Sequence, residues 1–183
     1  MESENLRGRL LIGGPALFDP NFRRAVVLVG EHSDEGALGV ILNRPSETPV
    51  RQAVPPLGSL VGPDEPVFVG GPVQGDSAVV IAEFENPSVA GLVAFGSIGF
   101  LVGDIEPTHV EGIRRARVFA GYAGWGAGQL EAELQEDGGW LIEEARPEDV
   151  FTTEPDRLWE RVVGRRPRPY AFLGTMPFDP SSN

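Results

Sequence analysis

The chain has 183 residues, with 15 basic residues, 27 acidic residues and a net charge of −12. This length suits one sizeable core, so we expect a single domain over residues 1–183. All the basic residues are arginine and there is no cysteine, which excludes a phosphate-loop lysine, a Schiff-base lysine, a thiolate nucleophile and a cysteine zinc site. The acidic balance opposes contact with a phosphate backbone, so we expect no direct nucleic-acid binding.

Targeting and membrane signals are weak. Met1–Glu4 is acidic, whereas a signal peptide begins with basic residues. Asn86–Gly103 is uncharged, but it is shorter than the roughly 20 residues of a spanning helix and is interrupted by glycine. We interpret it as buried core in two pieces joined near Gly96-Ser97, the second piece being a strand. The expected location is therefore cytoplasmic, without a membrane partner.

Short apolar runs between glycine and proline turns predict strands. In chain order these runs are Leu10–Ile12, Ala25–Val29, Leu38–Leu42, Val67–Val69, Ala78–Ala82, Ile98–Val102, Arg117–Tyr122 and Trp140–Ile142.

Helices are fewer. Gln129–Glu136 places leucines four residues apart, and a second helix follows Thr153, a candidate N-cap, and ends at Gly164. Val50–Val54 and His109–Arg115 are candidates for short helices. Because most strands lack a crossover helix between them, the pattern favours α+β with antiparallel or mixed pairing.

Asn43-Arg44-Pro45 and Gly70-Gly71-Pro72 each end a predicted buried strand. Asparagine offers a donor and an acceptor, and the arginine fork suits a carboxylate or phosphate. The structural alternative is that Asn43 caps a turn and Arg44 pairs with an acid. Strand ends gather at one rim of a sheet, so we expect the two turns to lie together, with an anion in the gap if Arg44 has no acidic partner.

Gly121–Gly128 follows a strand and precedes a helix, the context of a phosphate-binding loop. The dinucleotide spacing fails, because Gln129 stands where the third glycine belongs. The favoured interpretation is a tight turn with Trp125 packed as an anchor, Gln129 bonding nearby backbone and at least one glycine at positive φ. A partner-binding surface is the remaining possibility.

Glu31 and His32 are weak metal candidates, because carboxylate and imidazole together can hold a metal ion. Gly36 instead favours a solvated hairpin turn, so no metal or cofactor is expected. No catalytic residue is proposed either: Ser97 follows Phe95-Gly96 and so lacks the first glycine of a nucleophile elbow.

A basic stretch near the C-terminus contains Arg161, Arg165, Arg166 and Arg168. Pro167 and Pro169 interrupt it, which excludes a recognition helix. We interpret it as a solvated loop whose arginines pair with the acids that precede it.

Several segments together resemble the YqgE/AlgH family of bacterial proteins. They keep family order and span nearly the whole chain: Gly8–Ile12, Asp19–Phe22, Val26–His32, Gly36–Pro45, Val67–Val73, Phe119–Glu131 and Trp140. The resemblance implies one α+β domain with strongly curled mixed or antiparallel sheets forming a barrel-like body and a few flanking helices. Ala25 departs from the family's usual serine, which argues against hydroxyl chemistry there.

The resemblance implies no particular activity, although some family members are described as transcriptional regulators of alginate synthesis. We expect a non-catalytic binding or regulatory module with a protein or small-molecule partner. The alternative is a small-anion-binding enzyme or ligand sensor using the Asn43-Arg44 and Gly70-Gly71 turns. A pocket where these turns converge favours the alternative, and an exposed apolar patch favours an interaction module.

Overall fold

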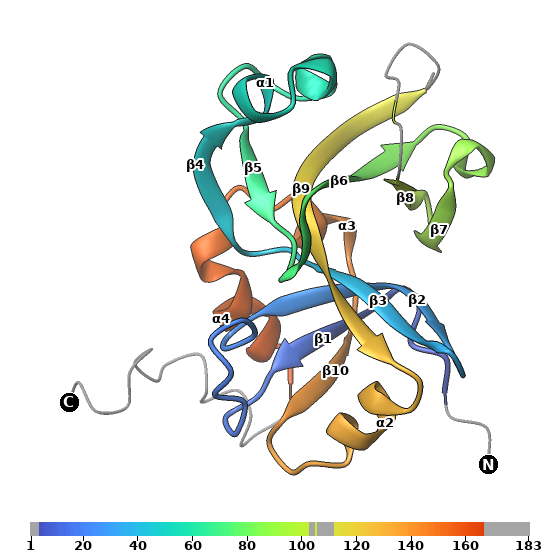
Figure 1. Ribbon diagram of the computed structural model, residues 1–183, viewed down its shortest axis with the longest axis vertical. Helices are drawn as coiled ribbons and strands as arrows, with labels where there is room; N and C mark the ends of the chain where they lie inside the picture. Colours follow the sequence, from blue (N-terminus) through green and yellow to red (C-terminus); the bar gives the residue numbers. More distant parts are fainter. Residues whose placement is uncertain (1–3, 103–104, 106–111, 167–183) are drawn as a thin grey trace.

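The computed structural model describes residues 4–102, 105 and 112–166 (Figure 1). The strands are β1 (Arg9–Gly13), β2 (Val26–Ser33), β3 (Gly36–Ile41), β4 (Pro45–Pro49), β5 (Pro66–Val69), β6 (Val73–Phe84), β7 (Leu92–Phe95), β8 (Ile98–Val102), β9 (Ile113–Gly126) and β10 (Trp140–Glu144). The α-helices are α1 (Val50–Ala53), α2 (Gln129–Leu134), α3 (Pro147–Val150) and α4 (Leu158–Val163). Short 3₁₀ turns are η1 (Pro55–Leu60), η2 (Pro87–Val89) and η4 (Pro155–Arg157).

The strands form one open sheet in the order β10-β1-β2-β3-β9-β6-β8-β7. Neighbours on this path are antiparallel, whereas β5 runs parallel to β9 and pairs with β4 on its other side. The expectation of an α+β domain with mostly antiparallel pairing is confirmed. The expectation of a barrel-like body is wrong, because the end strands β7 and β10 do not pair with each other.

The segment before β1 packs against the edge strand β7. A β-carbon added to Gly8 would lie 2.3 Å from the carbonyl oxygen of Ala94, so the segment before β1 packs directly against β7. Gly8 can make this approach because it has no side chain and adopts a φ of +82°.

Strand β9 joins the two halves of the molecule. Its first part pairs with β6 and its last four residues pair with β3, so it runs from the upper half to the lower half of Figure 1. The glycine-rich segment that the sequence suggested as a turn is therefore mostly strand. The turn itself is confined to Ala127 and Gly128, and Gly121 and Gly128 have the expected positive φ, +74° and +75°.

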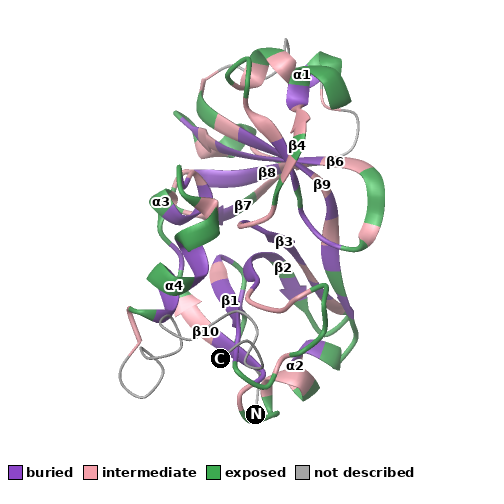
Figure 2. Ribbon diagram, turned by 90° about the vertical axis from the view of Figure 1, so that its left-hand side faces the viewer, coloured by how far each residue is buried: buried purple, intermediate pink, exposed green. Residues whose placement is uncertain are grey.

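Both faces of the central strands are buried (Figure 2). Leu10 and Ile12 join a cluster that reaches α4, while Leu11 between them joins a second cluster around Trp125. A third cluster lies under α1 and η1. Burial on both faces explains why these strands read as unbroken apolar runs rather than as alternating patterns.

Outside the central strands, the prediction for the stretch that contains β7 and β8 is confirmed only in part. The predicted break near Gly96-Ser97 and the strand after it are confirmed, and the piece before the break contains a strand as well. Burial of the whole Asn86–Gly103 stretch is wrong: Val89 is 48% exposed and Val93 is 36% exposed. Strand β7 lies at an edge, so one face of it meets solvent.

Two helix predictions also change. Thr153 makes no cap, and η4 begins at Pro155 before α4. The predicted helix His109–Arg115 is wrong over residues 113–115, which are strand, and its first part lies outside the described residues.

Candidate binding pocket

Asn43 fastens the loop before β2 to the end of β3. Its Oδ1 accepts a hydrogen bond from the backbone N–H of Val26 at 3.0 Å, and its Nδ2 donates to the carbonyl of Arg24 at 2.9 Å. Both polar atoms are thus engaged by backbone, which is the structural role that the sequence left open for asparagine at this turn.

Arg44 binds the same loop through its guanidinium. Nη2 donates to the carbonyl of Arg23 at 3.1 Å, and Nη1 donates to the carbonyl of Asn21. Burial lowers the pKa of Arg44, and the charge of Asp19 opposes this effect. Within the described part of the chain Arg44 forms no ion pair, so the structural alternative, pairing with an acid, is not what is observed.

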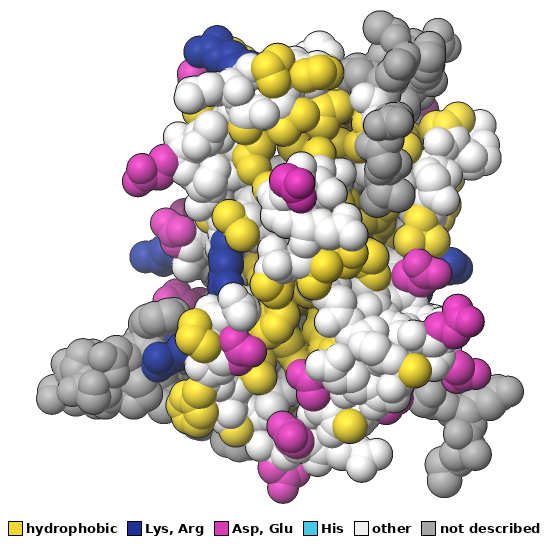
Figure 3. Space-filling view, in the orientation of Figure 1, with side chains coloured by type: hydrophobic (Ala, Val, Ile, Leu, Met, Phe, Trp, Pro, Cys, Tyr) yellow, Lys and Arg dark blue, Asp and Glu magenta, His cyan; other side chains and the backbone are white. Residues whose placement is uncertain are grey.

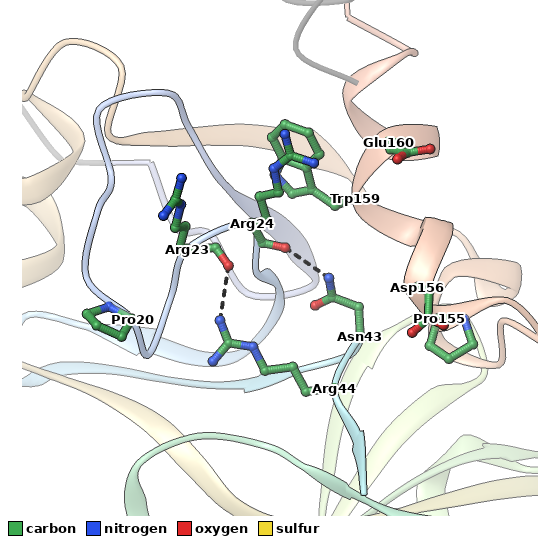
Figure 4. Close-up of a pocket in the computed structure, with 9 residues that line it drawn as sticks. All are labelled: Pro20, Arg23, Arg24, Asn43, Arg44, Pro155, Asp156, Trp159 and Glu160. Carbon is green, nitrogen blue, oxygen red and sulfur yellow. Dashed lines mark hydrogen bonds between the residues drawn. The ribbon is translucent and has the colours of Figure 1, made fainter. Parts of the chain in front are cut away.

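A pocket of about 500 Å³ opens beside these two side chains (Figure 4). Its lining comes from the loop before β2, the β3–β4 junction and the segment η4–α4. The lining residues are Pro20, Arg23, Arg24, Asn43, Arg44, Pro155, Asp156, Trp159 and Glu160. Three of the nine are arginine and two are acidic. The chain is acidic as a whole, and on the face shown in Figure 3 acidic side chains are widely spread while basic ones are scattered.

Arg24 and Trp159 contact each other in the pocket lining. The guanidinium carbon of Arg24 lies 4.4 Å from the centre of the Trp159 ring, a cation–π distance, and the indole N–H donates to the carbonyl of Gly13 at 2.9 Å. Arg24 has a φ of +53°, which is uncommon for a residue with a side chain. Burial lowers the pKa of Arg24, Glu160 opposes that effect, and Arg23 adds to it.

Sequence reasoning missed most of this pocket. Arg23 and Arg24 directly precede a buried strand, and this position is the one signal in the sequence that could have pointed to them. Trp159 belongs to the buried core, which gives no sign of a binding role, but it also lines the pocket. Nothing in the sequence indicated that Asp156 and Glu160 line a pocket, because charged residues on a short helix are usually solvated.

The second predicted turn adjoins the first without entering the pocket. The N–H of Val69 donates to the carbonyl of Arg44, and the N–H of Ile41 donates to the carbonyl of Gly70, each at 2.8 Å. The expected proximity is therefore observed. Gly70 and Gly71 face β9 instead of the pocket, and added β-carbons would lie 2.3 Å and 2.1 Å from its backbone. Their lack of side chains serves strand packing.

Trp125 and Gln129 lie in the lower half, away from the pocket lining. Trp125 is 5% exposed, and its ring centre lies 6.1 Å from that of Phe22 and 5.9 Å from that of Trp140. Gln129 accepts a hydrogen bond from the N–H of Gly126 at 2.9 Å. Both residues have the packing and turn-fastening roles that the sequence favoured.

Glu31 and His32 lie on the β2–β3 hairpin, and the strand turns them to opposite faces. His32 is buried: its Nδ1 accepts from the N–H of Leu6 at 3.0 Å and its Nε2 lies 2.6 Å from the Glu131 carboxylate. Glu31 is exposed. Among the described residues no three of the metal-ligating types come together to hold an ion.

The basic stretch is mostly engaged within the chain. Arg165 holds the buried carboxylate of Asp149 through both terminal nitrogens, and Arg166 lies 3.7 Å from Glu143. Arg161 donates to the hydroxyl of Thr152 at 2.9 Å. The expected pairing with preceding acids is confirmed for Arg165 and Arg166, whereas Arg161 lies on α4, not in a loop, and Arg168 lies outside the described residues.

Residues 10–171 match the family model described as AlgH-like. The chain belongs to this family. A relative from Mycobacteroides abscessus, named UPF0301 protein, is 44% identical over 186 residues, which cover 96% of this chain and 87% of the relative. This confirms the resemblance seen in the sequence.

Two solved structures of the AlgH-like fold align along almost the whole chain. A crystal structure from Corynebacterium diphtheriae has a TM-score of 0.84 at 27% identity and covers 96% of this chain and 95% of its own. The solution structure of AlgH from Pseudomonas aeruginosa has a TM-score of 0.71 at 29% identity, with 97% and 98% covered. As for membranes, none of the helices described here has the length and apolar character needed to cross one.

Proposed function

We propose that this AlgH-like protein is a non-catalytic binding module that holds a small anionic ligand in the pocket beside Arg44. The observation that carries the proposal is the state of the Arg44 guanidinium. It is withdrawn from water far enough to lower its pKa, yet its hydrogen bonds go to neutral carbonyls.

Electrostatics makes this arrangement receptive to an anion. A buried cation is stabilised best by an opposite charge at hydrogen-bond distance. Arginine has five N–H donors, and the two carbonyls of the loop use only part of that capacity. A carboxylate or phosphate entering the pocket would accept from the remaining donors as a charge-assisted pair.

The lining supports binding more than catalysis. It contains no serine, threonine, cysteine, histidine or lysine, which are the usual nucleophiles and bases of enzymes. Its carboxylates belong to Asp156 and Glu160, both exposed. A binding role, regulatory or not, requires only that these residues contact a ligand, and it needs no nucleophile or base. The expected absence of direct nucleic-acid binding and the cytoplasmic location remain predictions.

The test uses inorganic phosphate and succinate as probes, titrated at constant ionic strength and followed by amide chemical shifts. We expect saturable shifts around residues 20–24 and 43–44, with a dissociation constant on the order of 1 mM or tighter. Arg44→Gln and Arg23→Gln should each weaken binding about tenfold or more. Arg51→Gln is the matched control, because Arg51 is an exposed arginine outside the pocket. Linear, non-saturating shifts that are equal in all variants would disprove the proposal.

A further inference from the structure

The pocket is bipolar as well as cationic. Arg23 and Arg44 lie on one side of it, and Asp156 and Glu160 lie on the other (Figure 4). The two walls come from segments more than a hundred residues apart in sequence: the loop before β2 with the β3–β4 junction, and η4–α4. The structure thus presents two opposite charges to one cavity.

We infer that the ligand is a small zwitterion, a free amino acid or a dipeptide, with its carboxylate on Arg44 and its ammonium group toward Asp156 and Glu160. This inference rests on the proposed function and names the ligand class for the same pocket. A simple anion would gain from the arginine wall but would be repelled by the acidic wall. A ligand with both charges satisfies both walls.

The donor and acceptor chemistry agrees at each end. A carboxylate can take two parallel hydrogen bonds from a guanidinium, and an ammonium group has three donors for two carboxylates. Asp156 and Glu160 are four residues apart across the start of α4, a spacing that places side chains on one helical face. Arg24 lies over the Trp159 ring and interacts with the charge of Glu160, so it offsets part of the negative charge of the acidic wall.

The dimensions also fit. A cavity of about 500 Å³ lies within the range of roughly 300–1,000 Å³ that small-molecule sites occupy. Trp159 is buried and fixed by its bond to Gly13, so the inner end of the pocket is already formed before a ligand enters. A preformed pocket loses less free energy on ordering when the ligand binds.

The experiment compares each zwitterion with the same molecule lacking its positive charge. The panel is the twenty amino acids and Ala-Ala, each with its N-acetylated counterpart, at pH 6.5, where the α-amino group of both amino acids and dipeptides is protonated. Shifts in melting temperature select the best pair, and calorimetry measures both affinities. We expect at least one free form to bind about tenfold tighter than its N-acetylated counterpart.

Variants then locate the preference. In the double variant Asp156→Asn, Glu160→Gln the two affinities should agree within about twofold, while the N-acetylated form binds no more weakly than to the parent. Glu154→Gln, an exposed acid outside the lining, should keep the full preference.

Each contrary outcome is distinct. If N-acetylated forms bind as well as free forms in every pair, or if the preference survives in the double variant, the zwitterion inference is wrong while the anion pocket stands. If phosphate, succinate and the whole panel fail to bind, the proposed function is wrong and the inference is lost with it.

Discussion

Arg117 and Arg44 are two desolvated arginines with different surroundings. Arg117 on β9 is 8% exposed, pairs with Glu65 at 3.0 Å, donates to the carbonyls of Val150 and Thr152, and lies over the ring of Phe68. Arg44 donates to two carbonyls and forms no ion pair among the described residues, although the charge of Asp19 acts on it. Burial lowers the pKa of both. The chain therefore supplies a directly bound carboxylate to the structural arginine, whereas the arginine that lines the pocket has only the charge of Asp19, without an ion pair.

The largest effect we expect is from Arg117→Met. The variant removes an ion pair and leaves two buried carbonyls and Glu65 without their donor, so we expect a loss of about 3–5 kcal/mol in the free energy of unfolding. Urea denaturation followed by tryptophan fluorescence measures it. Arg51→Met is the control: its side chain is 62% exposed and its partner Asp64 is almost fully exposed, so its unfolding curve should overlay that of the parent.

A much smaller loss of unfolding free energy in Arg117→Met would show that Arg117 is not a structural arginine in the sense of this comparison. It would mean that the Glu65 pair and the two carbonyl bonds add little, and that burial alone does not distinguish the two arginines.

Arg44→Gln should destabilise the protein by much less, about 1 kcal/mol. Two hydrogen bonds to the loop are lost, but the unfavourable burial of an unpaired charge is lost with them. The same denaturation series measures this difference. A loss of about 3 kcal/mol or more would place Arg44 beside Arg117 as a structural arginine and would remove the basis of the ligand pocket.

The contrast between these arginines shows what the sequence could predict. The strand centres were predictable because a strand that is buried on both faces has a continuous run of apolar residues. The Asn43-Arg44 turn was predictable because polar residues directly follow such a run. Proximity of that turn to Gly70 followed from strand ends sharing a rim.

The rest depends on contacts between distant segments. Strands β4 and β7 were missed because β4 is framed by prolines and β7 is a short, half-exposed edge strand. The acidic wall of the pocket was missed because it is set by where α4 packs, and Trp159 bonding to Gly13, 146 residues away, has no local signature. The open sheet was missed because the pairing of its end strands β7 and β10 depends on how distant segments are arranged, which no local pattern shows.

Glu133 extends the comparison to a carboxylate, with the smallest expected effect. Burial raises the pKa of Glu133, and the negative charge of Glu136 adds to this effect. The neutral side chains of Trp140, Trp125 and Gln129 oppose it only in part. Asp149, fully buried, has instead Arg165. Glu133 therefore corresponds to Arg44, and Asp149 corresponds to Arg117.

The raised pKa of Glu133 fixes the sign of a pH dependence. A carboxyl whose pKa is higher in the folded state binds its proton more tightly there, so it favours folding at low pH, and this advantage is lost as the pH rises through its folded pKa. Above that pH the ionised Glu133 slightly lowers the free energy of unfolding.

Glu133→Gln removes the titration, so the variant should gain stability relative to the parent between pH 4 and pH 7. The gain stays below about 1 kcal/mol because the carboxylate is partly in contact with solvent. Melting temperatures of both proteins across this range measure it, with the exposed Glu47→Gln as control. A variant that instead loses stability toward pH 7 would show that the neutral donors outweigh burial at Glu133, and the correspondence with Arg44 would fail.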